Sequence, residues 1–145
     1  ELNSQMSINL HLSNCVKLTH QDYSYHFALL NTAFPNTSKS KQSWTIKINK
    51  ATVEICLGVC LKSKMQKYNF NSRNIKWGET GHGLYLIQSN GFCFSHSHQE
   101  FNRVGKSFKF DVGDVIVCEY DPIECKLRFI KNNADKFEMP MIAPP

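Results

Sequence analysis

Three residues with side chains that can bind zinc follow one another closely in the sequence: Cys93, His96 and His98. Their spacing, C-x-x-H-x-H, can supply a thiolate and two imidazoles to one ion. The run is strand-like, however, and side chains alternate between the two faces of a strand, so Cys93 points away from the face that the two histidines share. Gathering all three would require a bulge. We therefore favour a buried thiol followed by two histidines at a strand end, and we expect no metal and no other cofactor.

Other combinations of reactive residues are equally poor candidates for catalysis. Cys56 and Cys60 share one face of a predicted strand but would lie about 13 Å apart along it, too far for one metal ion or a disulfide. Asp114 and Asp121 belong to turn signals, Gly113-Asp114 and Asp121-Pro122, in which a carboxylate usually accepts hydrogen bonds from backbone N–H groups. The sequence contains no nucleophile elbow, no Gly-rich phosphate loop before a helix and no carboxylate pair at glycosidase spacing. We expect a protein that is not an enzyme.

The segment around Cys93 is the clearest structural signal in the chain. In GHGLYLIQSNGFCFSHS, residues 81–97, two alternating runs flank Asn90-Gly91. This dipeptide suits the two-residue turn of a β-hairpin because both positions tolerate positive φ. Apolar side chains occupy both faces of the runs, which predicts a buried strand pair.

Further alternating runs indicate a protein made almost entirely of strands. Residues 8–18 resemble a hairpin, residues 23–34 are a strand or a short helix, residues 44–48 are a strand with one wet face, and residues 53–61 are a central strand. More strands are expected at 108–112, 115–120 and 126–131, and Pro140 makes the last segment an edge strand. Residues 62–83 form a long polar loop, and no amphipathic helix of useful length is evident. Roughly ten short strands separated by turn signals predict a β-sandwich.

Composition limits the classes of partner. The chain has 145 residues, 41% of them hydrophobic, which suits a single domain over residues 1–145. Its net charge of +5 comes mostly from scattered lysines, which favours a solvated surface over a nucleic-acid interface. No apolar run approaches the roughly 20 residues that cross a bilayer, so we expect no membrane contact. Because the first residue is Glu1 rather than Met, we expect a domain excised from a longer protein, monomeric when isolated.

The six cysteines indicate the compartment. Most of them stand inside apolar, strand-like runs, and the chain has enough apolar residues to form a core without disulfides. We interpret them as free, buried thiols of an intracellular protein, more in keeping with the cytoplasm than with the nucleus.

Five motifs then follow one another along nearly the whole chain, from about Ile8 to Ile142. They are W-x-I-x-I (44–48), V-E-I-C-L-G-V (53–59), G-L-Y-L-I-Q-S-N-G (83–91), F-x-F-x-V-G-D-V-I (108–116) and Y-D with L-R-F (120–129). Each motif alone is weak, but in this order they resemble the SPRY domain, also called B30.2. Cys60, Val117-Cys118 and Asn132-Asn133 depart from the usual family residues at framework positions. The resemblance implies an all-β fold, a bent β-sandwich of two antiparallel sheets with a concanavalin-like jelly-roll topology.

The same resemblance implies a function. SPRY-like domains are non-catalytic modules that bind a peptide or a folded protein through loops at one face, often as substrate-recruiting or adaptor domains of ubiquitin ligases. One alternative is a structural subunit of a large assembly. A carbohydrate-binding sandwich is a weaker alternative, because it would need paired carboxylates or a calcium site that the sequence does not offer. The residues that match the family motifs are framework positions, so no partner-binding residue can be transferred from them.

We therefore choose binding candidates from residue types alone. Aromatic and Arg side chains are enriched at binding hot spots, and the 62–83 loop and the connection after the hairpin both contain them. The alternative is that the aromatic residues merely hold the first loop on the sandwich and that the second is a solvated connection. The candidates are Tyr68, Phe70, Arg73, Trp77, His96, His98 and Arg103.

Overall fold

The computed structural model describes residues 39–51 and 53–142, together with Phe27, Leu29 and the backbone of two short strands. These short strands, β1 (Ile8–Asn9) and β2 (Cys15–Val16), pair antiparallel, as the predicted N-terminal hairpin requires. The rest of that hairpin, and most of the segment predicted at 23–34, lies outside the described residues.

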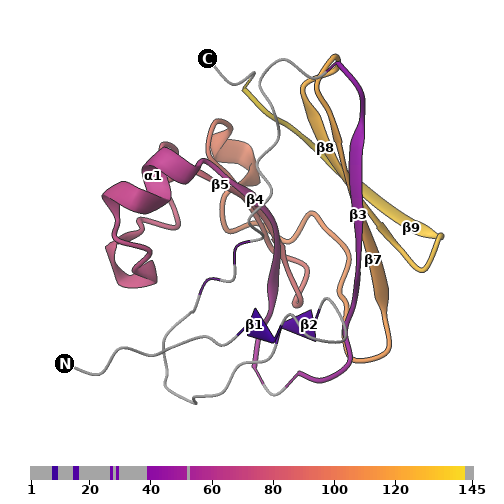
Figure 1. The fold of residues 1–145 in the computed structure, drawn as a ribbon. Coiled ribbons are helices and arrows are strands. Elements are labelled where there is room, and N and C mark those ends of the chain that lie inside the picture. Colours follow the sequence, from indigo (N-terminus) through magenta and orange to yellow (C-terminus); the bar gives the residue numbers. More distant parts are fainter. Residues whose placement is uncertain are drawn as a thin grey trace.

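Two larger antiparallel sheets form the body of the protein (Figure 1). The first has the order β3-β7-β8-β9, with β3 at Gln42–Lys47, β7 at Val115–Asp121, β8 at Lys126–Lys131 and β9 at Asp135–Pro140. The second has the order β4-β5-β6, with β4 at Cys56–Cys60, β5 at Leu84–Gln88 and β6 at Cys93–Ser95. This arrangement confirms the all-β sandwich of two antiparallel sheets, whereas the jelly-roll topology stays a prediction.

The main hydrophobic core lies between the two sheets. Alternate residues of each strand point into it, among them Tyr85 and Ile87 of β5, Ile116 and Cys118 of β7, and Phe129 of β8. All five are at most 1% exposed. Because side chains repeat with period two along a strand, one face of each sheet enters this core. The four-stranded sheet exposes its other face, as the alternating burial of β3 and β8 shows.

A second, smaller core covers the opposite face of the sheet β4-β5-β6. Leu84 and Leu86 of β5 and Phe94 of β6 pack there against Met65, which is fully buried, and Ile75. Met65 belongs to α1 (Lys62–Lys67), and two 3-10 turns, η1 (Ser72–Asn74) and η2 (Gln99–Phe101), follow in the connections. In Figure 1, α1 lies on the side of β4 and β5 away from the four-stranded sheet.

This second core corrects two predictions. Residues 62–83 were expected to form a loop, but α1 and η1 occupy part of them, held by Met65 and Ile75. Six helical residues with one buried side chain leave no periodic signal in the sequence. The strand at 53–61 was expected to be central, but among the described strands β4 stands at the end of its sheet and begins only at Cys56. Both faces of β4 are covered, one by each core. A run that is apolar on both faces is typical of a central strand, and the sequence alone does not show whether a second strand pairs with it.

The hairpin at Asn90-Gly91 is confirmed, but its turn differs from the one predicted. Ile87 pairs with Cys93, and the Gln88 N–H donates to the Phe92 carbonyl, so three residues form the connection. Of the three connecting residues, 89–91, only Gly91 has a positive φ, at 94°. This is the geometry of a type I turn followed by a glycine bulge. A further correction concerns residues 108–112, which belong to no strand although the Phe110 N–H donates to the Ser89 carbonyl.

Candidate functional site

A buried polar cluster fixes the base of the hairpin. His82, 2% exposed, accepts a hydrogen bond at Nδ1 from the Leu84 N–H at 3.0 Å, so its proton resides on Nε2, which donates to Asn102 Oδ1 at 3.0 Å. Asn102 also accepts from the Ser95 N–H at 2.9 Å and donates to the Ser95 carbonyl at 2.8 Å. His96 Nδ1 accepts from the Gly83 N–H at 2.9 Å. Because a protonated Nδ1 cannot accept a hydrogen bond, both imidazoles must be neutral to bind these backbone N–H groups.

The electrostatics of this cluster agree with its hydrogen bonds. Burial lowers the pKa of His82 below its ordinary value, although the hydrogen bond to Asn102 opposes the shift. Burial also lowers the pKa of His96, and the neighbouring His82 and Lys64 lower it further. The two rings lie 6.4 Å apart. The cluster is therefore a structural support that keeps β5 and the connection 96–103 together.

An aromatic pocket of about 280 Å³ opens on the outer side of the sheet β4-β5-β6. Trp77 and Phe94 meet there edge to face, with ring centroids 5.3 Å apart, and Trp77 Nε1 donates to the Ser72 carbonyl at 3.2 Å. Phe92, 38% exposed, and Arg103 supply a further apolar surface and a positive charge. The pocket is lined by Glu54, Cys56, Trp77, Gln88, Asn90, Phe92, Phe94 and Arg103.

An aliphatic pocket of about 350 Å³ lies beside it. Its lining consists of Ala51, Val53, Glu54, Ile55, Ser89, Asn90, Phe110 and Asp111. Because Glu54 and Asn90 line both pockets, the two are neighbours, and we call them together the hairpin groove. Their volumes lie near the lower limit of the roughly 300–1,000 Å³ typical of small-molecule sites, so each suits one side chain better than a whole cofactor.

Glu54 stands at the boundary between the two pockets. Its carboxylate accepts hydrogen bonds from Gln88 Nε2 and, at 2.9 Å, from Asn90 Nδ2. Asn90 is itself oriented by the hydrogen bond that its Oδ1 accepts from the Phe92 N–H at 3.0 Å. The hairpin turn therefore builds the middle of the groove, and its side chains are held in place before any ligand arrives.

The structure brings only two of the seven predicted binding residues to this groove, Trp77 and Arg103. Tyr68 directly follows α1 as its C-cap and packs on the smaller core, whereas Phe70 is 42% exposed and does not line either pocket. Arg73 is exposed on η1. His96 belongs to the polar cluster, and His98 Nδ1 lies 2.7 Å from Ser97 Oγ. The residues chosen from the sequence thus lie in different places, and their role in binding stays a prediction.

Sequence reasoning missed the other groove residues. Phe92, Phe94, Gln88 and Glu54 were assigned to strand framework, and nothing in period-two alternation indicates which face of a strand borders a pocket. Glu54 gave one usable signal, because a charged residue stands there within an otherwise apolar run. Asn102 gave none, since asparagine is abundant in this chain.

The residues that the sequence analysis weighed and rejected as metal ligands or catalytic groups occupy separate environments. The Cys93 thiol faces the Val104 carbonyl in the main core, while the two histidines have the partners described above. Among the described residues, His, Cys, Asp and Glu form no group of three that could hold a metal ion. Asp114 Oδ2 accepts from the Asp111 N–H at 2.8 Å, and Asp121 Oδ1 from the N–H groups of Ile123 and Glu124 at 3.0 Å, which confirms that both carboxylates cap turns.

Ser97 and His98 resemble a nucleophile and base pair. Tyr85 Oη also lies 3.1 Å from Ser97 Oγ. In the part of the chain that the structure describes, no carboxylate contacts His98 within hydrogen-bond distance, so the group that orients the base of a triad is not seen there.

The five described cysteines, Cys56, Cys60, Cys93, Cys118 and Cys125, are free thiols. Burial raises the pKa of Cys56 and of Cys118 to about 12. It raises the pKa of Cys93 to about 11. These values keep the thiols protonated and unreactive at neutral pH.

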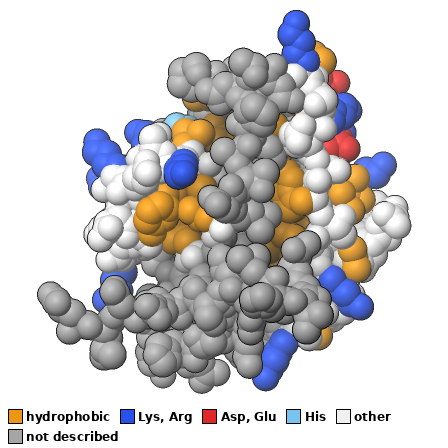
Figure 2. All heavy atoms as spheres, in the orientation of Figure 1, with side chains coloured by type: hydrophobic (Ala, Val, Ile, Leu, Met, Phe, Trp, Pro, Cys, Tyr) orange, Lys and Arg blue, Asp and Glu red, His pale blue; other side chains and the backbone are white. Residues whose placement is uncertain are grey.

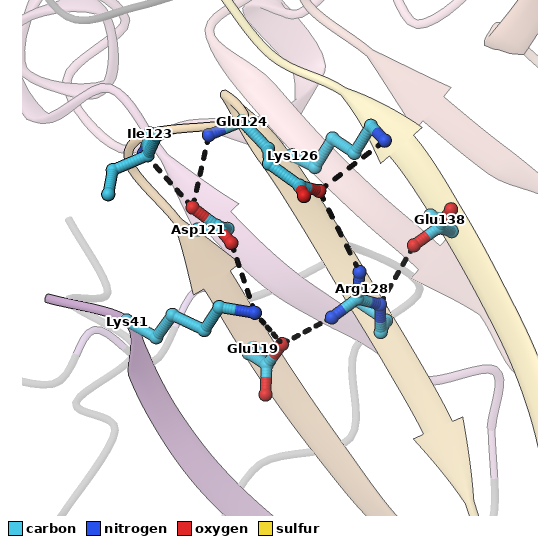
Figure 3. A network of polar contacts seen from close by, with 8 residues as sticks. All are labelled: Lys41, Glu119, Asp121, Ile123, Glu124, Lys126, Arg128 and Glu138. Atoms are coloured by element: carbon cyan, nitrogen blue, oxygen red, sulfur yellow. Dashed lines mark hydrogen bonds and ion pairs between the residues drawn. The ribbon is translucent and has the colours of Figure 1, made fainter.

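The densest group of charges lies elsewhere, on the outer face of the four-stranded sheet (Figure 3). Arg128 on β8 stands opposite Glu119 on β7 and Glu138 on β9, and its Nε donates to Glu138 at 2.8 Å. Lys41 Nζ lies 3.1 Å from Asp121 and 3.7 Å from Glu119. The hydrogen bond with Arg128 lowers the pKa of Glu138. These charges pair across neighbouring strands, so we assign them to sheet stability rather than to binding.

The surface view agrees with a scattered positive charge. In Figure 2, Lys and Arg side chains are distributed around the edge of the visible face, whereas hydrophobic side chains gather near α1 and alongside β3. No helix in the described residues has both the length and the apolar character needed to span a membrane.

Comparisons of the chain with protein-family models, with curated proteins and with solved structures find no match. The resemblance to SPRY domains therefore rests on the order of the sequence motifs and stays a prediction.

Proposed function

We propose that this domain is a non-catalytic protein-interaction module that binds a short peptide, or an extended segment of a folded partner, in the hairpin groove. The observation that supports this most is the groove itself, with Trp77, Phe92 and Phe94 beside Arg103. Aromatic side chains provide a large contact area, and Trp and Arg are among the residue types most enriched at hot spots.

Two features support peptide binding over small-molecule binding. The groove is open and divided into two side-chain-sized pockets, which suits a chain that places successive side chains along a surface. The polar side chains in the middle of the groove, Glu54, Gln88 and Asn90, are already held by hydrogen bonds, so a ligand has less protein ordering to impose there. The SPRY-like order of motifs supports the same class of function, including an adaptor or substrate-recruiting domain within a longer protein.

The experiment compares two exposed phenylalanines. Peptides are selected from a random display library against the 145-residue chain, and dissociation constants are measured by fluorescence polarisation. Phe92→Ala removes groove surface and should weaken binding about tenfold, or about 1.4 kcal/mol. Phe70→Ala is the matched control, because Phe70 is similarly exposed, 42% against 38%, but lies outside the groove.

The results separate three cases. An effect of Phe92→Ala with none of Phe70→Ala supports the groove. An effect of Phe70→Ala alone would contradict it and would move the binding surface to the segment after α1. A library that yields no binding peptide would contradict the proposed function as a whole.

A further inference from the structure

Three positive charges lie together on α1. Lys62 and Lys67 are exposed, and Lys64 is half-buried. No residue from 55 to 78 is acidic, and the carboxylate of Glu79, the next acidic residue, already pairs with a different lysine at 3.4 Å. Among the ion pairs that the described residues form, none includes one of these three lysines. Figure 2 shows Lys and Arg side chains around α1 on the visible face. We call the three lysines the basic surface of α1.

Helix stability accounts for this arrangement only in part. Lys64 and Lys67 belong to the last turn of α1, where a positive charge is favourable, but residues three apart are neighbours on a helix and like charges there repel. Lys62 is in the first turn, where a positive charge opposes the helix dipole and no acidic residue offsets it. A negatively charged ligand would relieve both effects.

Contacts with the start of β5 fix the position of this surface. The N–H group of Leu61, the residue before α1, donates to the Gly83 carbonyl at 2.7 Å. A Cβ added to Gly83 would lie 2.5 Å from the Lys64 Cβ, so the lysine stem packs closely on the chain there. The charge of Lys64 also lowers the pKa of His96, at the base of the hairpin. The basic surface is therefore held against the sheet β4-β5-β6.

The hairpin groove lies at the other end of the same strands. Cys56 and Gln88 line the groove and pair with each other, whereas Cys60 pairs with Leu84, next to α1. Four residues of extended strand separate Cys56 from Cys60, which corresponds to about 13 Å. An extended peptide rises about 3.3 Å per residue, so one that starts in the groove reaches the basic surface about four to seven residues further along.

We propose that the peptide in the hairpin groove carries acidic side chains that bind the basic surface of α1. This proposal rests on the proposed function, and it adds the chemistry of the partner: an apolar or aromatic residue in the aromatic pocket and Asp or Glu residues about four to seven positions away. A nucleic acid would need a longer positive stripe, whereas the other lysines of the chain are scattered. The net charge of +5 favours the approach of an acidic partner.

The first test uses charged probes, so it does not depend on finding a peptide. Fluorescein-labelled hexaglutamate and, separately, hexaglutamine are titrated with the chain and followed by fluorescence polarisation. Hexaglutamate should bind roughly tenfold more tightly, and its binding should weaken as the salt concentration rises from about 0.05 M to about 0.5 M. In the ¹⁵N-labelled chain it should shift the backbone amides of Lys62, Lys64 and Lys67.

Two double variants separate the local charge from the charge of the whole chain. Lys62→Glu with Lys67→Glu reverses the basic surface, whereas Lys47→Glu with Lys136→Glu reverses two exposed lysines on β3 and β9. Each substitution changes the charge by −2, so both variants carry +1 instead of +5. The first should weaken hexaglutamate binding roughly tenfold, and the second at most about twofold.

Three results would overturn the proposal. Hexaglutamine might bind as tightly as hexaglutamate, or the two double variants might weaken binding equally or not at all. A thymidine hexanucleotide that binds the basic surface more tightly than hexaglutamate would assign this surface to nucleic acid instead of an acidic peptide.

The failure of this proposal can be told apart from that of the proposed function. A selected peptide that depends on Phe92 but binds the Lys62→Glu, Lys67→Glu variant as tightly as the parent chain would overturn the acidic-peptide proposal and leave the groove in place. A peptide insensitive to Phe92→Ala would overturn the groove as the peptide site, while the hexaglutamate titration would still decide what the basic surface binds.

Discussion

Replacing Asn102 with alanine should destabilise the fold more than any exposed substitution. The Asn102 side chain makes three hydrogen bonds, at 2.8 to 3.0 Å, with the backbone N–H and carbonyl of Ser95 and with His82 Nε2. Asn102 is 6% exposed, His82 is 2% exposed and Ser95 is fully buried, so water reaches these groups poorly. Alanine would leave three buried polar groups without a partner.

The magnitude follows from the number of groups. Each buried polar group without a partner costs about 1–3 kcal/mol, and partial entry of water reduces the sum, so we expect a loss of about 3–5 kcal/mol in the free energy of unfolding. A domain of this size has only about 5–15 kcal/mol of stability, so the variant should lie close to its unfolding limit.

Urea denaturation followed by tryptophan fluorescence measures this loss. The control is Asn74→Ala, because Asn74 is exposed and makes one side-chain hydrogen bond, at 3.3 Å, to the Tyr68 carbonyl. We expect the control to change stability by about 0.5 kcal/mol or less. A loss below about 1 kcal/mol for Asn102→Ala would refute the claim that this cluster supports the hairpin.

Three further predictions concern the histidines, a glycine and the thiols. The folded pKa of His82 and of His96 is lowered from 6.5, so the unfolded chain binds more protons than the folded one as the pH falls. Their contribution to stability should therefore be complete above about pH 6.5 and decline as the pH falls through the folded pKa values. A urea midpoint that stays constant when the pH is lowered from about 7.5 to about 5 would contradict this prediction. Gly58→Ala should lower the free energy of unfolding by about 3 kcal/mol or more, since a Cβ there would lie 2.0 Å from the Tyr85 carbonyl oxygen. Gly113 has a positive φ but open space around it, so Gly113→Ala should cost only about 1–2 kcal/mol. Urea denaturation measures both losses of stability, and equal losses would contradict this prediction. The buried thiols of Cys93 and Cys118 should resist iodoacetamide at neutral pH until urea is added, and rapid modification of the native chain, measured by intact mass, would argue against their burial.

Much of the fold could be predicted from alternation and turn signals. The strands at β3, β7, β8 and β9 follow period-two patterns, and Pro140 correctly indicated an edge. Alternation states which residues share a face, but not what covers that face. This is why the two apolar faces of β4 suggested a central strand when they contact a sandwich core on one side and the α1 layer on the other.

The site could be predicted only in part. Trp77 and Arg103 were chosen by residue type and do line the groove, whereas Phe70, chosen by the same rule, does not. The difference depends on where the chain bends after α1, where Asn69 and Phe70 both adopt positive φ. The polar pairs that build the groove and its support, Glu54 with Asn90 and His82 with Asn102, join residues 36 and 20 positions apart, and a local pattern contains no information about them.

The central claim is that a partner peptide occupies the hairpin groove, and hydrogen–deuterium exchange with mass spectrometry tests it most directly. The chain should be compared alone and saturated with the tightest peptide from the display library. We expect the largest added protection at residues 53–56, 89–94 and 103, with little change on the outer face of β3, β7, β8 and β9. Protection confined to that outer face, or to α1 and Phe70, would contradict the account.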